Sequence, residues 1–180
     1  MIWTSSLNLA LISIAFLITA LSLMFVIWPG SIHKTFSQNA ARNKASIRYY
    51  AVTFIVFLSM FTLVMWSAFG RWSHYKLDDV WLWYVTGATA QIVAVLVPEV
   101  GGRRTYIHRI AADVSAISAL LVLIFIQVMS WPWVLIALPI MILIILFTLL
   151  KKGNPRYALI LQIIYFSTFF AALITASPTP

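Results

Sequence analysis

The sequence has no cysteine and few charged residues. Without cysteine there can be no disulfide, no thiolate nucleophile, no iron–sulfur cluster and no metal site with cysteine ligands. Charged residues make up 9% of the 180 positions, whereas soluble domains average about a quarter. With hydrophobic residues at 63%, this composition excludes a soluble globular core.

The charge that is present is mostly positive, giving a formal net charge of +8. In a soluble protein this excess would suggest a nucleic-acid partner, but here no soluble basic domain could carry such a site. Nucleic acid is therefore not an expected partner. We expect the basic residues to face the anionic lipids of a membrane surface.

Six apolar runs are separated by short connections. At a rise of about 1.5 Å per residue, each run can cross a hydrocarbon core of about 30 Å. The first run has no Lys or Arg before it, which predicts a retained helix rather than a cleaved signal peptide. The sequence predicts an all-α fold, a single polytopic transmembrane domain over residues 1–180. Its six spans are expected at residues 7–28, 50–69, 80–97, 107–129, 133–150 and 157–176.

The basic residues predict an orientation for these spans. Ten of the twelve Lys and Arg residues lie in three alternating connections, residues 29–49, 98–109 and 151–156. The positive-inside rule places these connections in the cytoplasm and both termini outside. Seven of the eight tryptophans fall at the opposite, outer ends of the spans, where interfacial aromatic residues are expected. We therefore expect an integral protein of a prokaryotic cytoplasmic membrane.

Small residues indicate how the spans pack. The span at 107–129 places small residues and one histidine on one side, as helices do where they approach closely in lipid. The span at 133–150 is almost entirely aliphatic and contains Pro139, so we expect it to be kinked and to face lipid. The predicted packing side consists of His108, Ala111, Ala112, Ser115, Ser118 and Ala119.

The connection before that span concentrates polar residues. A Gly-Gly pair lets backbone amides point at an anion, a helix N-terminus adds a positive dipole end, and arginines donate bidentate hydrogen bonds to phosphate. The pattern indicates a site for an anionic phospholipid headgroup. The alternative is that the glycines only turn the chain and the arginines only set the topology. The candidate headgroup residues are Gly101, Gly102, Arg103, Arg104 and Arg109.

Three titratable residues are candidates for chemistry: Glu99, His108 and Asp113. Asp113 is the only acid expected inside a span, which makes it a functional candidate, but Arg109 lies four residues earlier, where an ion pair would form. Both interpretations stay open, with the ion pair favoured. His108 could act as a base. The other histidines give no metal-ligand spacing, and we predict no metal and no cofactor.

The segment from Pro98 through His108 to Ala119 has a Pro-acid turn and then a histidine at the start of an Ala/Ser-rich helix. In this segment and in its six apolar runs, the chain resembles the DRAM/Frag group of six-helix membrane proteins and its uncharacterised bacterial relatives. The resemblance implies roles linked to lipid, in membrane organisation or lipid remodelling, and it transfers no catalytic residues.

Three functional hypotheses follow. The first is a non-enzymatic membrane protein that engages anionic lipid at its cytoplasmic rim. The second is an intramembrane lipid-modifying enzyme or proton-coupled carrier that uses Asp113, His108 and Glu99. The third is an accessory subunit of a larger membrane complex, with helix seams that contact partner subunits or further copies of the chain.

Overall fold

The structure, a computed structural model, describes residues 2–69, 77–97, 99–127, 132–150 and 157–175, and every regular element in these ranges is a helix. The all-helical prediction is therefore confirmed for the described chain. The helices are α1 (Ile2–Ile27), α2 (Phe36–Ala40), α3 (Lys44–Phe69), α4 (Leu77–Leu96), α5 (Gly102–Gln127), α6 (Pro132–Leu150) and α7 (Ala158–Thr175).

Each long helix corresponds to one of the six apolar runs. Three of them contain segments long and apolar enough to cross a membrane: Leu7–Ile27, Lys44–Ser67 and Gly102–Phe125. The other three contain shorter apolar segments: Val80–Leu96, Ile136–Phe147 and Ala158–Ile174. By length and composition, the three helices with the longer segments are compatible with a membrane-embedded protein. The short helix α2, within the first basic connection, was not predicted.

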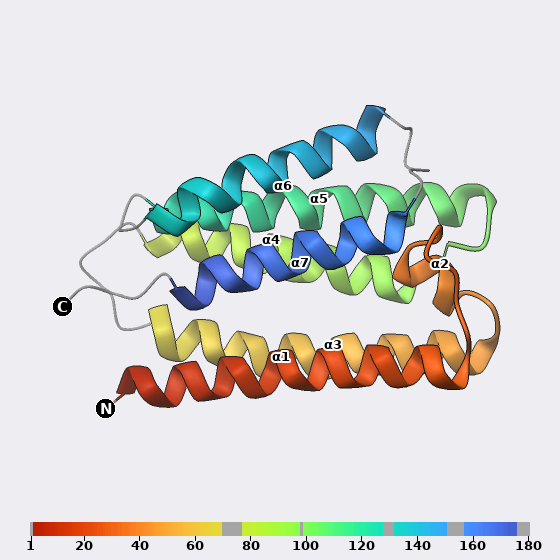
Figure 1. Cartoon of the computed structure of the whole chain (residues 1–180), viewed down its shortest axis with the longest axis horizontal. Helices are drawn as coiled ribbons and strands as arrows, with labels where there is room; N and C mark the ends of the chain where they lie inside the picture. The colour runs from red at the N-terminus through yellow and green to blue at the C-terminus, as the bar shows by residue number, and fades with distance from the viewer. Residues whose placement is uncertain (1, 70–76, 98, 128–131, 151–156, 176–180) are drawn as a thin grey trace.

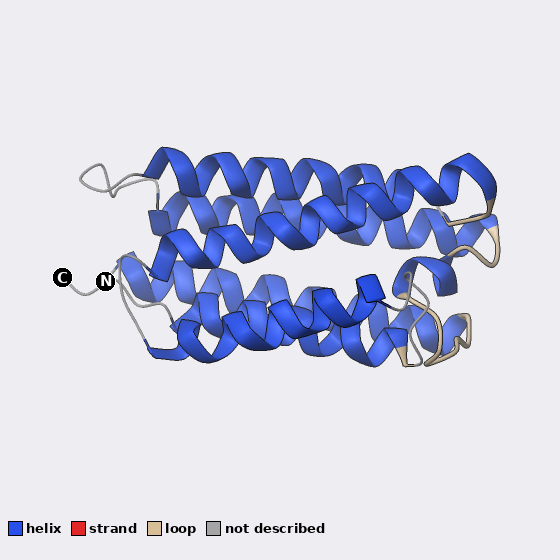
Figure 2. Cartoon of the chain, turned by 90° about the horizontal axis from the view of Figure 1, so that it is seen from above, coloured by secondary structure: helices blue, strands red, loops and turns tan. Residues whose placement is uncertain are grey.

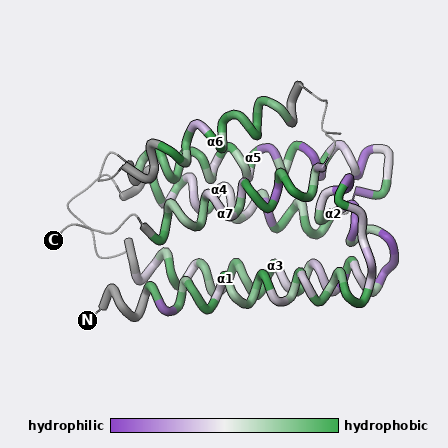
Figure 3. Tube along the Cα trace, in the orientation of Figure 1, coloured by the Kyte–Doolittle hydropathy of each residue, from purple (hydrophilic) through white to green (hydrophobic). Residues whose placement is uncertain are grey.

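The long helices lie alongside one another and follow the long axis of the molecule (Figures 1 and 2). Helix α1 packs on α3, α4 packs on α5, and α6 contacts both α5 and α7. Because successive helices run in opposite directions, α2, the end of α4 and the start of α5 meet at one end of the molecule. The hydrophilic segments of the trace gather there (Figure 3). We call this the basic end, defined by Lys34, Arg42, Lys44, Arg48, Arg103, Arg104 and Arg109.

Helices α4 and α5 have the most extensive contact among the described helices, and small residues let their backbones approach each other. Gly87 faces Ser118, and a Cβ atom added to Gly87 would lie 2.9 Å from the Ser118 Cβ. Ala94 and Ala111 are also buried. The predicted small-residue side of the fourth apolar run does therefore pack against a neighbouring helix.

Hydroxyl groups within the apolar helices are satisfied by the helix backbone. The hydroxyls of Ser13, Ser59, Thr62 and Thr86 each donate to the carbonyl oxygen four residues earlier, at 2.7 to 2.9 Å. Such bonds are typical of polar side chains in helices that lie in an apolar environment, where no water is at hand.

Helix α6 presents one aliphatic face to the outside of the helix bundle, and the lipid contact and kink expected for this span stay predictions. Its inner residues Ala137 and Met141 are buried, whereas Leu143 is 64% exposed. Helix α6 diverges from α5 towards its C-terminal end (Figure 1). The interior between α3, α4, α5 and α7 is lined by side chains that leave an internal space.

Candidate functional site

A cavity of about 270 Å³ lies among the long helices, with contributions from α1 and from all of α3 to α7. This volume is many times the roughly 30 Å³ that one water molecule occupies in the liquid. Most of the wall is aromatic or aliphatic, and its aromatic members also contact one another, as Phe57, Phe61 and Phe170 do. The aromatic residues of the wall are Tyr50, Phe54, Phe57, Phe61, Trp83, Tyr84, Tyr165, Phe166, Phe169 and Phe170.

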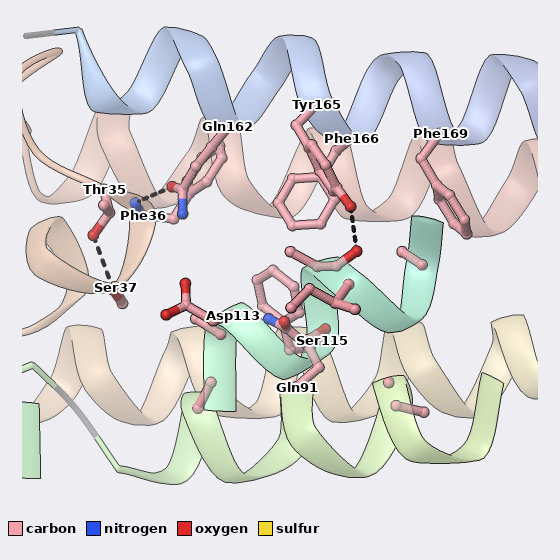
Figure 4. Close-up of a pocket in the computed structure, with 18 of the residues that line it drawn as sticks. Thr35, Phe36, Ser37, Gln91, Asp113, Ser115, Gln162, Tyr165, Phe166 and Phe169 are labelled. Atoms are coloured by element: carbon pink, nitrogen blue, oxygen red, sulfur yellow. Dashed lines mark hydrogen bonds between the residues drawn. The ribbon is translucent and has the colours of Figure 1, made fainter. Parts of the chain in front are cut away.

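Polar residues gather in the part of the cavity nearest the basic end. They come from α2 and the residue before it, from the α4–α5 connection, and from α5 and α7, and Figure 4 shows several of them. Asp113 and Gln162 face each other there across the space between α5 and α7 (Figure 4). We call this set the polar cluster, defined as Thr35, Ser37, Glu99, His108, Arg109, Asp113 and Gln162.

His108 is at the centre of the hydrogen bonds of this cluster and is only 6% exposed. Its Nδ1 lies 2.6 Å from the carbonyl oxygen of Ala94 and 3.0 Å from that of Val97. Its Nε2 lies 2.9 Å from the Ser37 hydroxyl oxygen. Because carbonyl oxygens only accept hydrogen bonds, Nδ1 must carry the proton, and in the neutral ring Nε2 accepts from Ser37.

A hydroxyl chain leads from Thr35 to His108. The Thr35 Oγ1 accepts from the Gln38 backbone amide at 3.1 Å, and it lies 2.9 Å from the Ser37 Oγ (Figure 4). Since the Ser37 proton is directed to His108, Thr35 must donate to Ser37. The arrangement fixes the Ser37 hydroxyl towards the free lone pair of the imidazole.

Local sequence holds Thr35 and Ser37 in place. Thr35 is the N-cap of α2, and the Gln38 side chain accepts a bond from the Thr35 amide at 3.0 Å, which completes a capping box. Asn39 is 2% exposed, and its side chain bonds backbone groups of Ser31, Lys34 and Thr35. Helix α2 is tied to α7 by a bond of 2.8 Å from the Phe36 amide to the Gln162 Oε1.

The ion pair of Arg109 differs from the expected one. The sequence favoured a pair between Arg109 and Asp113, but the Arg109 Nε donates to the Glu99 Oε1 at 3.1 Å. The Glu99 side chain is 7% exposed and that of Arg109 is 45% exposed. The expected salt bridge is therefore not the one that forms, although the charge of Arg109 still acts on Asp113. Helical spacing leaves out the turn before α5, which brings Glu99 back over the first turns of that helix.

The predicted headgroup residues are at the surface of the basic end. Gly101 and Gly102 have positive φ angles of 104° and 60°, which glycine adopts without steric cost. The Gly101 amide donates to the Thr105 hydroxyl at 2.7 Å, so this amide is already engaged. Arg103 and Arg104 are exposed. Of the candidate headgroup residues, Arg109 lines the cavity, and Gly101, Gly102, Arg103 and Arg104 are not among its lining residues.

The structure thus brings the three predicted chemical candidates, Glu99, His108 and Asp113, into one cavity. Within the part of the chain that the structure describes, no group of three His, Asp or Glu side chains could hold a metal ion. His33 instead contacts the ring of Tyr157, with 5.3 Å between the ring centroids.

Sequence reasoning missed Thr35, Ser37 and Gln162 as members of the site. One signal was present for the first two, because Thr35 followed three residues later by Gln38 is a capping-box pattern that predicts a helix start inside the first basic connection. No local pattern pairs Ser37 with His108, which lies 71 residues away along the chain.

No protein-family model, no curated protein and no solved structure matches this chain. The resemblance to the DRAM/Frag group therefore stays a prediction, and the function must be argued from the site.

Proposed function

We propose that this is an integral membrane protein that holds one chain of an anionic lipid in its aromatic cavity, with the lipid headgroup at the basic end. The observation that carries the proposal is the polarity of the cavity. An apolar, largely aromatic wall leads to the polar cluster beside the basic residues, and Gln91 and Ser115 are further polar residues of the wall. A lipid has the same sequence of groups along its length, an apolar chain followed by a polar headgroup.

The membrane setting is part of the proposal. The six long helices would all span the bilayer, including the three whose described apolar segments are shorter. By the positive-inside rule the basic end would face the cytoplasm, and both termini would lie outside. The headgroup would then sit at the level of the inner leaflet, whose anionic lipids attract basic side chains.

The charges at the basic end support an anionic headgroup. Arg103 and Arg104 are exposed in the first turn of α5. Arg109, further along the same helix, lines the cavity, and while its Nε is engaged by Glu99 its other guanidinium nitrogens can donate elsewhere. A cationic side chain near a membrane surface contributes about 1 kcal/mol to the binding of anionic lipid. Gly101 and Gly102 would contribute by letting the chain turn so that these arginines begin α5.

The test is to fill the cavity. Ala88 lines it, whereas its neighbour Thr89 is exposed and is not among the lining residues. The variant Ala88→Phe should lose most of the lipid that co-purifies in mild detergent, because the added ring occupies the space of the chain. The variant Thr89→Phe places the same ring on the same helix but outside the cavity, and it should retain the lipid. Native mass spectrometry of the two variants measures the retained lipid directly, and equal retention would contradict the proposal.

A further inference from the structure

The polar cluster contains a serine and a histidine in the arrangement of a nucleophile and its base. The Ser37 Oγ lies 2.9 Å from the His108 Nε2, within the range for proton transfer between such groups. Both side chains line the cavity. Neither needs another residue to move before the hydroxyl proton can pass to the imidazole.

The backbone at the end of α4 takes the part that a carboxylate takes in a catalytic triad. The carbonyl oxygens of Ala94 and Val97 hold the proton on the His108 Nδ1 and orient the ring. These carbonyls belong to the C-terminal end of a helix, where unpaired carbonyl groups favour positive charge. The site is thus arranged to stabilise the imidazolium that forms when His108 takes a proton.

From this geometry we propose that Ser37 is a nucleophile and His108 its general base, and that the cavity takes a lipid ester whose acyl group passes to Ser37 and then to water. The proposal rests on the lipid-holding function above and adds a reaction to it. In a lipid ester the carbonyl lies between the headgroup and the chain, and in the site the hydroxyl lies between the basic end and the aromatic wall.

The reaction balances without a further reactant except water. The Ser37 Oγ attacks the ester carbonyl carbon as its proton moves to the His108 Nε2. The bond from that carbon to the alcohol oxygen breaks, and the alcohol leaves with the proton from Nε2. Water then gives a proton to Nε2 and attacks the carbonyl carbon of the acyl-serine. The bond from that carbon to the Ser37 Oγ breaks, the fatty acid leaves, and Nε2 returns its proton to Oγ.

Gln162 lines the same cavity as Ser37 and is the donor that we assign to the negative oxygen of the tetrahedral intermediate. Its Oε1 is fixed by the Phe36 amide at 2.8 Å, so its amide nitrogen is turned towards the cavity, where it faces Asp113 (Figure 4). An amide donor held in place in this way needs no reorganisation when charge develops on the substrate.

A hexadecyl fluorophosphonate tests the nucleophile without knowledge of the natural ester. The wild-type protein should gain the mass of one phosphonyl group, and peptide mapping should place it on Ser37. The variant Ser37→Ala should gain none. The variant His108→Asn keeps a side-chain donor for the α4 carbonyls but has no base, and it should label at least tenfold more slowly. Ser59→Ala removes an exposed serine of α3 that is not among the cavity-lining residues, and it should label as wild type does.

The mapping on the wild-type protein decides the matter even if a variant fails to fold. No adduct, an adduct on another residue, or labelling of His108→Asn at the wild-type rate would overturn the proposal. Retained lipid together with no adduct would leave the lipid-holding function standing and remove only the reaction. An adduct on Ser37 together with equal lipid retention by the Ala88→Phe and Thr89→Phe variants would leave the reaction of Ser37 standing and remove the lipid-holding function.

Discussion

At the residue scale, two carboxylates lie near Arg109, and the one that it binds decides what a change at Arg109 does to stability. Glu99 is nearly buried and receives the Arg109 Nε, whereas Asp113 lines the cavity and is exposed. A carboxylate left buried without its partner is costly, but the guanidinium here is half-exposed, so solvent weakens the pair. Loss of the pair therefore lowers the stability of the protein mainly because the Glu99 carboxylate is left buried without a partner.

A double-mutant cycle shows which carboxylate pairs with Arg109. Arg109→Gln should lower the free energy of unfolding in detergent by about 1 kcal/mol, because Glu99 loses its partner. Adding Glu99→Gln should restore part of that loss, because neither charge is then stranded. Adding Asp113→Asn is the matched comparison and should restore less, because the charge of Arg109 acts on Asp113 whereas the ion pair itself is made with Glu99. If Asp113→Asn restored the stability and Glu99→Gln did not, Arg109 would pair with Asp113, as the sequence favoured.

Single residues also show why sequence reasoning found only part of the site. Glu99, His108 and Asp113 stand out because charged or titratable residues are rare in this chain. Ser37 does not stand out, since serines are scattered along the chain and most are packing residues. Ser37 becomes part of the site only in the folded structure, where α3 and α4 bring the chain back to the basic end and α5 comes to lie beside α2.

At the scale of elements, the six long helices were predictable because each is an uninterrupted apolar run between polar connections. The expected run at 107–129 begins at Gly102 in the structure, since the helix continues into the arginines that the hydropathy pattern excluded. Helix α2 has five residues and too little apolar periodicity to be recognised, and only its capping box marks it.

The packing of α4 on α5 predicts whether Gly87→Ala raises or lowers stability, because helix propensity and overpacking act in opposite directions there. In an isolated helix, Gly→Ala stabilises by about 1 kcal/mol. At Gly87 the new Cβ would meet the Ser118 Cβ at 2.9 Å, and overpacking of this kind costs roughly 1–3 kcal/mol. We expect Gly87→Ala to lower the melting temperature, and Ser118→Gly in the same chain to recover part of the loss. A rise in melting temperature for Gly87→Ala alone would mean that the two helices are less close than described.

At the scale of the whole molecule, the described basic residues are concentrated at one end of the helix bundle. Hydrophilic segments of the trace gather at the basic end (Figure 3), and the cavity wall includes aromatic residues from α3, α4 and α7. The sequence predicted the charge asymmetry but not the cavity. Aromatic residues in an apolar run can equally face lipid, and the side chains that line the cavity come from all seven described helices.

The chain of a bound lipid should reach a contact between α3, α4 and α7 that lies away from the polar cluster. Phe61 contacts both Tyr84 and Phe170 there, with ring centroids 6.3 and 5.4 Å apart. Leu63 and Val85 lie close by in sequence on α3 and α4 but are 60% and 54% exposed on the outside. These two sets of residues distinguish a chain inside the protein from one that lies against its surface.

The most direct test of a lipid chain held in the interior is photo-crosslinking. One equivalent of an anionic phospholipid with a diazirine at the end of one chain is bound in detergent and irradiated, and the modified residues are mapped by mass spectrometry. The account predicts crosslinks to Phe61, Tyr84 and Phe170, which Ala88→Phe abolishes and Thr89→Phe leaves intact. Crosslinks confined to outward-facing residues such as Leu63 and Val85 would contradict it.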